Sequence, residues 1–182
     1  FYSKNAFDIV SSVFNKYVDV KWITGSKVIY NERSEIIKYA LPYKYRQSLI
    51  QVGAYGKNLP FIQQESTFWK KELLNLVDYK YLKTLKKSGD MYLWFCFSKK
   101  YKLISIETYL SGFKFHENQL TFRETGNTDP YLREASTFLK KKNVFNYLII
   151  FLDSGFWFLS KYLTQLFSFF NNQIITFDRE SQ

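Results

Sequence analysis

The stretch from Val144 to Phe170 constrains the fold more than any other part of the chain. Eighteen of its 27 residues are apolar or aromatic, and five of the polar ones recur at intervals of seven or four residues. They are Asn146, Asp153, Ser160, Thr164 and Ser168. At 100° per residue these positions fall within roughly 80° of a helical wheel, so the pattern predicts one long helix with a broad apolar face. Such a helix is not stable alone in water, and we expect that face to be covered.

A neighbouring protein is the covering that we expect for this helix. Asp153 and Lys161 lie near its middle, and each charge would cost about 2.5–3.5 kcal/mol at the centre of a bilayer. Contact of residues 144–170 with a membrane is the alternative. With the apolar face covered by protein, the polar stripe is expected to face water. The predicted partner-binding residues are Phe151, Phe156, Phe158, Leu159, Leu163 and Phe167.

The chain divides by charge into two parts. The chain has a net charge of +10. Residues 144–182 contribute −1, so residues 1–143 contribute +11. With 182 residues and 46% apolar composition, the chain is large enough to bury one sizeable core. We therefore expect a basic α+β body over residues 1–143, followed at 144–182 by the apolar helix and a short tail.

Periodicity and turn residues predict the elements of the body. Apolar residues three and four apart, from Phe7 to Val18, indicate an amphipathic helix. Gly25 and Ser26 lie between two β-prone runs, which indicates a hairpin. The segment 46–55 reads as a strand. A hydroxyl cap, helical spacing and a final glycine predict a helix from about Thr67 to Lys87.

An antiparallel meander packed with amphipathic helices is expected at the centre of the α+β fold. Its strands are the segments 91–97, 102–110, 112–116 and 119–125, which alternate with short polar turns. Thr128, Asp129 and Pro130 then provide a cap and a first-turn proline, so a helix is expected over residues 130–141.

The residue inventory argues against an enzyme. There is one histidine, His116, and one cysteine, Cys96, so the chain lacks the groups for a Cys/His zinc site and offers one imidazole for acid–base chemistry. Cys96 lies in an apolar run, where a buried, inert thiol is expected. The glycines at 53 and 56 lack the spacing of a phosphate-binding loop and indicate a turn. We expect no catalytic residue, metal, cofactor or small-molecule substrate.

Lysines gather near the ends of the predicted elements, next to aromatic residues. Surfaces that bind nucleic acid combine lysines, which contact phosphates, with aromatic rings, which stack on bases. Solvated lysines above aromatic residues of the core would give the same sequence pattern. The predicted nucleic-acid-binding residues are Lys70, Lys71, Lys80, Lys83, Lys86, Lys87, Lys99, Lys100, Lys102, Lys140, Lys141 and Lys142.

Composition suggests where such a chain is encoded. Residues with A/T-rich codons dominate, and Lys outnumbers Arg 21 to 5. A mitochondrial or plastid genome fits this bias best, and a nuclear gene of an organism with A/T-rich codon usage is the alternative. The favoured hypothesis is a structural, non-catalytic subunit of a mitochondrial ribosome that binds rRNA and neighbouring proteins, located in the matrix or at the inner membrane. The alternative is an accessory subunit of a respiratory-chain or other organellar membrane complex.

Overall fold

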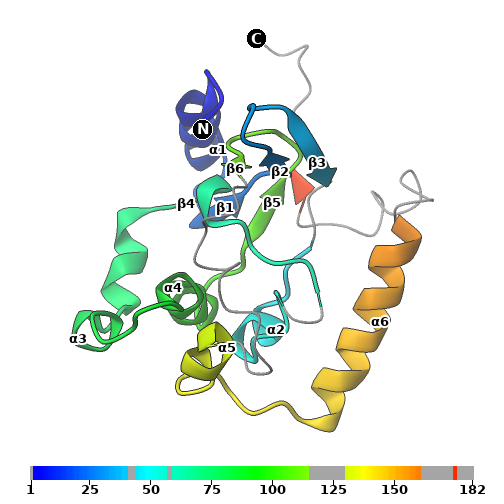
Figure 1. Cartoon of the computed structure of the whole chain (residues 1–182). Coiled ribbons are helices and arrows are strands. Elements are labelled where there is room, and N and C mark those ends of the chain that lie inside the picture. The colour runs from blue at the N-terminus through cyan, green and yellow to red at the C-terminus, as the bar shows by residue number, and fades with distance from the viewer. Residues whose placement is uncertain (1, 41–43, 57–58, 115–129, 161–173, 176–182) are drawn as a thin grey trace.

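The computed structural model describes residues 2–40, 44–56, 59–114, 130–160 and 174–175, and they form the mixed α+β fold that the sequence predicts (Figure 1). Two small sheets lie between helices of different lengths. The helices are α1 (Ala6–Lys16), α2 (Gln47–Gln51), η1 (Gln64–Ser66), η2 (Lys71–Leu76), α3 (Tyr79–Leu82), α4 (Gly89–Ser98), α5 (Pro130–Ala135) and α6 (Val144–Ser160), where η marks a 3₁₀ helix.

The first sheet has the strand order β4-β1-β5-β7. Its strands are β1 (Trp22–Thr24), β4 (Thr67–Trp69), β5 (Ile104–Ile106) and β7 (Ile174–Ile175). β1 pairs antiparallel with β4 and parallel with β5, and β5 pairs parallel with β7. Side chains alternate across β1: Trp22 belongs to the core cluster that contains α4, while Ile23 packs with α1. Helices therefore cover both faces of this sheet.

The second sheet has the order β3-β2-β6 and is mostly a hairpin. β2 (Lys27–Tyr30) pairs antiparallel with β3 (Ile36–Ala40) and parallel with β6 (Phe113–Lys114). The hairpin closes at Asn31, which accepts a hydrogen bond from the Glu35 amide through Oδ1 and donates one to its carboxylate through Nδ2.

The hairpin predicted at Gly25 and Ser26 is not found, because β1 and β2 lie in different sheets. The Gly25 amide donates to the Ser66 carbonyl, and the Ser26 amide donates to the Thr108 carbonyl. A Cβ on Gly25 would lie 2.9 Å from the Thr108 oxygen. Glycine is needed here for the close approach of another backbone segment, which a turn signal does not distinguish from a hairpin.

The expected meander is wrong, because its first segment is the helix α4. Met91, Tyr92 and the five residues from Trp94 to Ser98 are all buried, so the helix is apolar on every side and shows no 3.6-residue period. Its Trp94 stacks on Trp22 with ring centroids 5.7 Å apart. The segments 102–110 and 112–116 contain β5 and β6, which lie in different sheets, while 119–125 is outside the described residues.

The helix predicted from Thr67 to Lys87 is divided into β4, η2 and α3. Thr67, Phe68 and Trp69 pair with β1, and this tertiary pairing overrides the helical spacing of the apolar side chains. Asp78 then starts a new helix, since its Oδ1 accepts from the amides of Lys80 and Tyr81.

Helix α2 replaces the strand predicted over 46–55. Its end is fixed by Gly53, which has φ of 62°. The Gly53 amide donates to the Ile50 carbonyl and the Ala54 amide to the Leu49 carbonyl, the two hydrogen bonds of a Schellman motif. The turn expected at the glycines is therefore confirmed, but as a helix end. Five residues are too few to show helical periodicity.

The amphipathic N-terminal helix is confirmed as α1, with a different buried face. Ala6, Val10 and Val13 pack on Ile23 and Ile106, whereas Phe7, Tyr17 and Val18 are exposed. The helix expected over 130–141 is also found, but α5 ends at Ala135. Thr128 and Asp129 lie outside the described residues.

The side of helix α6 that faces the body contains Ile150 and two residues of the polar stripe, Asn146 and Asp153, so the stripe does not face water as expected. Asn146 is 8% exposed and Asp153 is 5% exposed. Asn143 and Asn146 exchange amide-to-side-chain hydrogen bonds, a capping box at the start of the helix. Asp153 accepts from Arg46 Nε, at 3.1 Å for Oδ1 and 2.8 Å for Oδ2. The rest of the predicted long helix, 161–170, lies outside the described residues.

Glu134 of α5 holds the segment that leads into α4. Its carboxylate accepts hydrogen bonds from the backbone amides of Lys86, Lys87 and Ser88 and from the Ser88 hydroxyl, at 2.7–2.9 Å. These bonds, led by that from the Lys86 amide, lower the pKa of Glu134 to about 2.

We expect Glu134→Gln to lower the free energy of unfolding by about 1–2 kcal/mol at pH 7, because hydrogen bonds to a charged acceptor are lost. The folded pKa is below the unfolded one, so this contribution is present above about pH 4.5 and is lost as the pH falls toward 2. Denaturant unfolding of both proteins at pH 7, 4.5 and 3 measures the difference, which should shrink with the pH. The exposed Glu107→Gln is the control, and a pH-independent difference would contradict the assignment.

We expect a double-mutant cycle with Asp153→Ala and Arg46→Ala to give a coupling of about 1–2 kcal/mol, because each single change removes the same ion pair. The value is limited by Arg46, whose side chain is 42% exposed. Amide hydrogen exchange should show that α6 loses protection first. Additive effects of the two substitutions would mean that the pair does not hold the helix.

Candidate RNA-binding and partner-binding surfaces

Ten of the twelve predicted nucleic-acid-binding lysines are exposed, and Lys70 and Lys142 are half-buried. Lys70 donates to the Val18 carbonyl at 3.3 Å, and its ammonium lies 5.5 Å from the centre of the Phe14 ring. It is therefore held against α1. Lys140 contacts the side chain of Gln51 at the end of α2.

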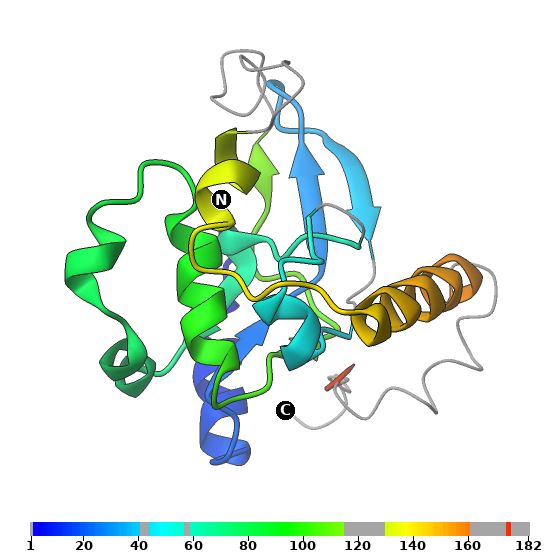
Figure 2. The same ribbon diagram turned by 90° about the horizontal axis from the view of Figure 1, so that it is seen from below.

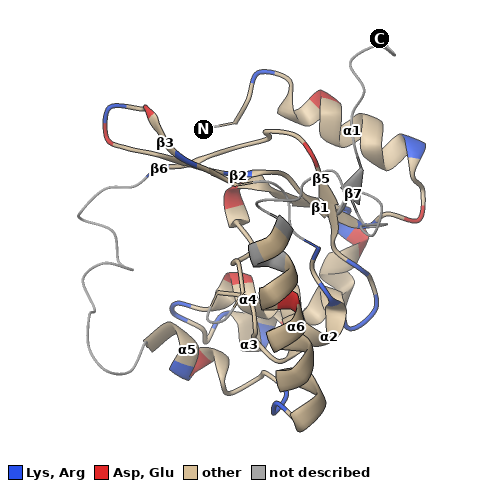
Figure 3. Ribbon diagram, turned by 90° about the vertical axis from the view of Figure 1, so that its right-hand side faces the viewer, with Lys and Arg blue, Asp and Glu red and all other residues tan. Residues whose placement is uncertain are grey.

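The structure does not gather these lysines on one strip, as the distribution of blue segments shows (Figure 3). Glu72 lies in the field of Lys21, Lys70 and Lys100, and its pKa is lowered, first by the hydrogen bond from Lys21. The three lysines around Glu72 form a first group of cations. A second group lies around Asp153, and a third, Lys86 and Lys87, borders a pocket.

The group around Asp153 contains two basic residues that the lysine pattern missed. Lys44 lies near Arg46, Asp153 and Lys102, and its pKa is lowered, first by burial and then by the other cations. Arg46 is one of only five arginines in a lysine-rich chain, which was the one sequence signal for its role. Arginine forms directed hydrogen bonds to a carboxylate, and Arg46 uses them on Asp153.

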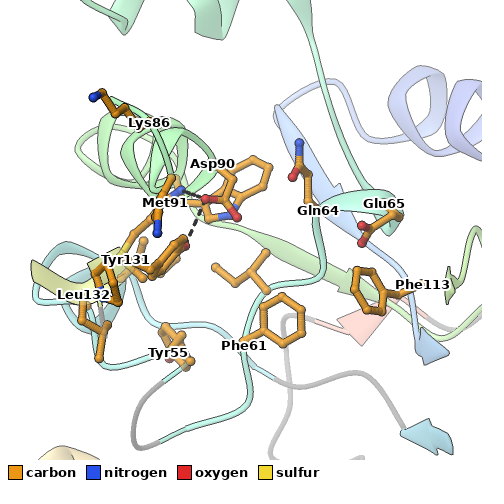
Figure 4. A pocket seen from close by; sticks show the side chains of 17 residues that line it. Tyr55, Phe61, Gln64, Glu65, Lys86, Asp90, Met91, Phe113, Tyr131 and Leu132 are labelled. Carbon is orange, nitrogen blue, oxygen red and sulfur yellow. Dashed lines mark hydrogen bonds between the residues drawn. The ribbon is translucent and has the colours of Figure 1, made fainter. Parts of the chain in front are cut away.

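A pocket of about 720 Å³ opens where α4, α5 and the segment after α2 meet (Figure 4). Asp90 and Tyr131 lie on one side, Gln64, Glu65 and Phe113 lie on the other, and Phe61 lies between them. No sequence pattern pointed to it, because Asp90 and Tyr131 are 41 residues apart in the chain.

Asp90 is a partly buried carboxyl group in the wall of the pocket. Its Oδ1 accepts from the Met91 amide at 2.7 Å and from the Tyr131 hydroxyl at 3.0 Å. Burial nevertheless raises the pKa of this carboxyl above its usual value. The carboxylate is therefore held rigidly in a poorly solvated place, where an added hydrogen-bond donor would be favourable.

The apolar face of α6 points away from the body. Figure 2 shows the helix beside α2 at the edge of the molecule. Val144 is 86% exposed and Phe151 is 75% exposed. The other large side chains of this exposed face are Phe145, Tyr147, Leu148, Leu152, Phe156 and Leu159.

The exposed face of α6 includes the predicted partner-binding residues Phe151, Phe156 and Leu159. Nothing is described of the Phe158 side chain, or of Leu163 and Phe167. Contiguous apolar patches of this kind mark interaction surfaces. Within the described part of the chain, no helix combines the length and the apolar character needed to cross a bilayer.

The structure offers little for metal or thiol chemistry in the residues it describes. These residues contain no group of three His, Cys, Asp or Glu side chains placed to hold a metal ion. Cys96 is buried, as expected, and burial raises the pKa of its thiol. His116 lies outside the described residues.

Comparison with the models of known protein families finds no match for this chain, and comparison with curated protein sequences finds none either.

Proposed function

We propose that the chain is a structural, non-catalytic subunit of an organellar ribosome, most consistent with a mitochondrial one, and that it binds rRNA through its lysine-rich surfaces. Its other partners are neighbouring proteins that cover α6. The location would be the matrix or its membrane surface.

One observation supports this proposal more than any other: α6 joins the body through Asn146, Ile150 and Asp153 and leaves most of its large apolar side chains outside. Burial of about 1,000 Å² of apolar surface is worth on the order of 25 kcal/mol before ordering costs, at roughly 25 cal/mol per Å². A soluble monomer gains nothing from this orientation, whereas a subunit of an assembly gains a large docking surface.

The charge supports an RNA component of that assembly. The chain carries a net charge of +10, and most of the predicted lysines extend into solvent. A protein that is enclosed by folded RNA contacts the RNA backbone on several sides. Its lysines can therefore bind phosphates without forming a single strip. The separate groups at Glu72, Asp153 and the pocket suit such an environment.

An accessory subunit of an organellar membrane complex remains the second candidate. The same exposed face of α6 favours it, since aromatic and aliphatic side chains without charge also suit the surface of a bilayer.

We expect that replacing Lys71, Lys83, Lys86 and Lys87 by Gln flattens the dependence of rRNA affinity on salt. Each lost phosphate contact should reduce the slope of log K against log salt by about 0.7–0.9, because fewer condensed counterions are released. Titrations of labelled rRNA fragments between 50 and 200 mM KCl measure the slope.

The matched control for this charge change removes four other exposed cations, Lys4, Lys16, Arg33 and Lys38, again by replacement with Gln. Equal slopes for the two variants would mean that RNA affinity depends on the total positive charge and not on these four lysines. Absence of any RNA binding by the native chain would contradict the RNA part of the proposal.

We expect the double variant Phe151→Asp, Phe156→Asp to release the chain from its assembly, because two carboxylates cannot be desolvated in an apolar interface without a partner. Both side chains are exposed, so the fold should be retained. Sedimentation of organelle lysate after mild detergent shows where the chain travels, and near-ultraviolet circular dichroism checks the core.

The control for the released variant is Ile36→Asp, Ile37→Asp on β3, which exposes the same number of new charges elsewhere. That variant should stay in the assembly. If the native chain resists carbonate extraction and partitions with lipid, the membrane complex is the better assignment.

A further inference from the structure

The pocket beside α4 has the three components with which proteins hold an unpaired nucleotide. Its walls include the rings of Phe61, Phe113 and Tyr131, its side carries the carboxylate of Asp90, and its edge carries Lys86 and Lys87. Rings stack on bases, a carboxylate accepts hydrogen bonds from base edges, and ammonium groups bind phosphates. The volume of about 720 Å³ is within the range of small-molecule sites.

The rings are available to a ligand. Phe61 is 38% exposed, and its position is fixed by its backbone, whose carbonyl accepts from the Tyr45 hydroxyl at 3.2 Å. The ammonium of Lys27 lies 4.3 Å from the centre of the Phe61 ring. Phe113 and Tyr131 are half-buried and border the opening from the other two sides (Figure 4).

Hydrogen bonds to their backbone amides hold the two lysines at the edge of the pocket. Glu134 binds the amides of Lys86 and Lys87, and both side chains are exposed. Figure 4 shows Lys86 extending away from the centre of the pocket. A cation in this place can bind a phosphate outside the pocket, while the interior of the pocket can hold a nucleobase.

We propose that this pocket binds one unpaired nucleobase of the RNA, stacked on Phe61 and hydrogen-bonded to Asp90, while Lys86 and Lys87 bind the adjoining phosphates. This inference rests on the proposed RNA-binding function and names the part of the RNA that the site takes: a single-stranded loop, bulge or end. A base within a duplex is stacked and paired, so it does not enter.

The carboxylate selects among bases. Cytosine and adenine present an exocyclic amino group, and guanine presents an amino group beside a ring N–H, all of which donate to a carboxylate. Uracil presents one N–H between two carbonyl oxygens, which a carboxylate repels. The pocket therefore favours bases with an amino group, and uracil is the weakest ligand.

The test compares binding of the full chain to labelled hexacytidylate, hexauridylate and a duplex of the same length. We expect hexacytidylate to bind about fivefold or more tightly than hexauridylate, from one directed base contact, and the duplex to bind more weakly than either. Fluorescence anisotropy gives the affinities, and quenching of Trp94, which lines the pocket, reports entry of the base.

Two variants locate the effect in the pocket. Asp90→Asn keeps an oxygen for the Met91 amide and the Tyr131 hydroxyl and adds an amide donor, so it should remove the preference for cytosine over uracil. Phe61→Leu should weaken hexacytidylate binding about tenfold through loss of stacking. Tyr79→Leu, an exposed ring on α3 outside the pocket, is the matched control and should leave binding unchanged.

The outcomes separate this inference from the proposed function. If RNA binds with strong salt dependence but the native chain does not distinguish the three ligands, the pocket does not hold a base, while the lysine surfaces keep their role. The same conclusion follows if Asp90→Asn and Phe61→Leu, both folded by circular dichroism, behave like the native chain. If no RNA binds at all, both proposals fail.

Discussion

The stacking of Trp22 on Trp94 is the contact around which the rest of the structure is arranged. Trp22 lies in β1, Trp94 lies in α4, and their rings are nearly parallel at 5.7 Å. Phe97 meets Trp22 edge-on at 5.5 Å, and Trp69 of β4 adds its ring to Trp94 at 5.7 Å. The Trp22 Nε1–H donates to the Tyr101 carbonyl, so the one polar atom of this buried ring has a partner. One face of the first sheet, α4 and the segment after it are thereby fixed together.

This core also explains which elements the sequence predicted and which it concealed. Helix α1 is exposed on one side, and its apolar residues therefore recur at helical intervals. Helix α4 is enclosed on all sides, so nothing in the order of its residues distinguishes it from a buried strand. Thr67–Trp69 lies in a sheet because β1 pairs with it from 43 positions away in the chain, and no local pattern contains that information. Sequence reasoning recovers elements that are half-exposed and loses those that the tertiary fold encloses.

The candidate surfaces divide in a similar way. Exposure of the lysines and the aromatic character of α6 follow from residue type, and most of the described positions agree with it. Residue type does not predict which side of α6 faces the body. That side is set by the contact of Asp153 with Arg46, whose position depends on how α2 packs. The pocket was equally inaccessible to sequence reasoning: Asp90, Tyr131 and Phe61 come from three separate segments that only the folded chain brings together. Residue chemistry predicts what a surface can bind, and packing decides where that surface lies.

The outward apolar face of α6 also sets how a cell would treat surplus copies of this chain. Chaperones and proteases recognise contiguous apolar side chains, which folded monomers normally hide. Here the folded chain displays such side chains on α6, among them Val144, Phe151 and Leu159. If the chain is the subunit proposed above, a newly made copy without its neighbours carries its own degradation signal, and assembly removes that signal. The abundance of the subunit would then follow the number of places available to it, without any separate regulator of its synthesis.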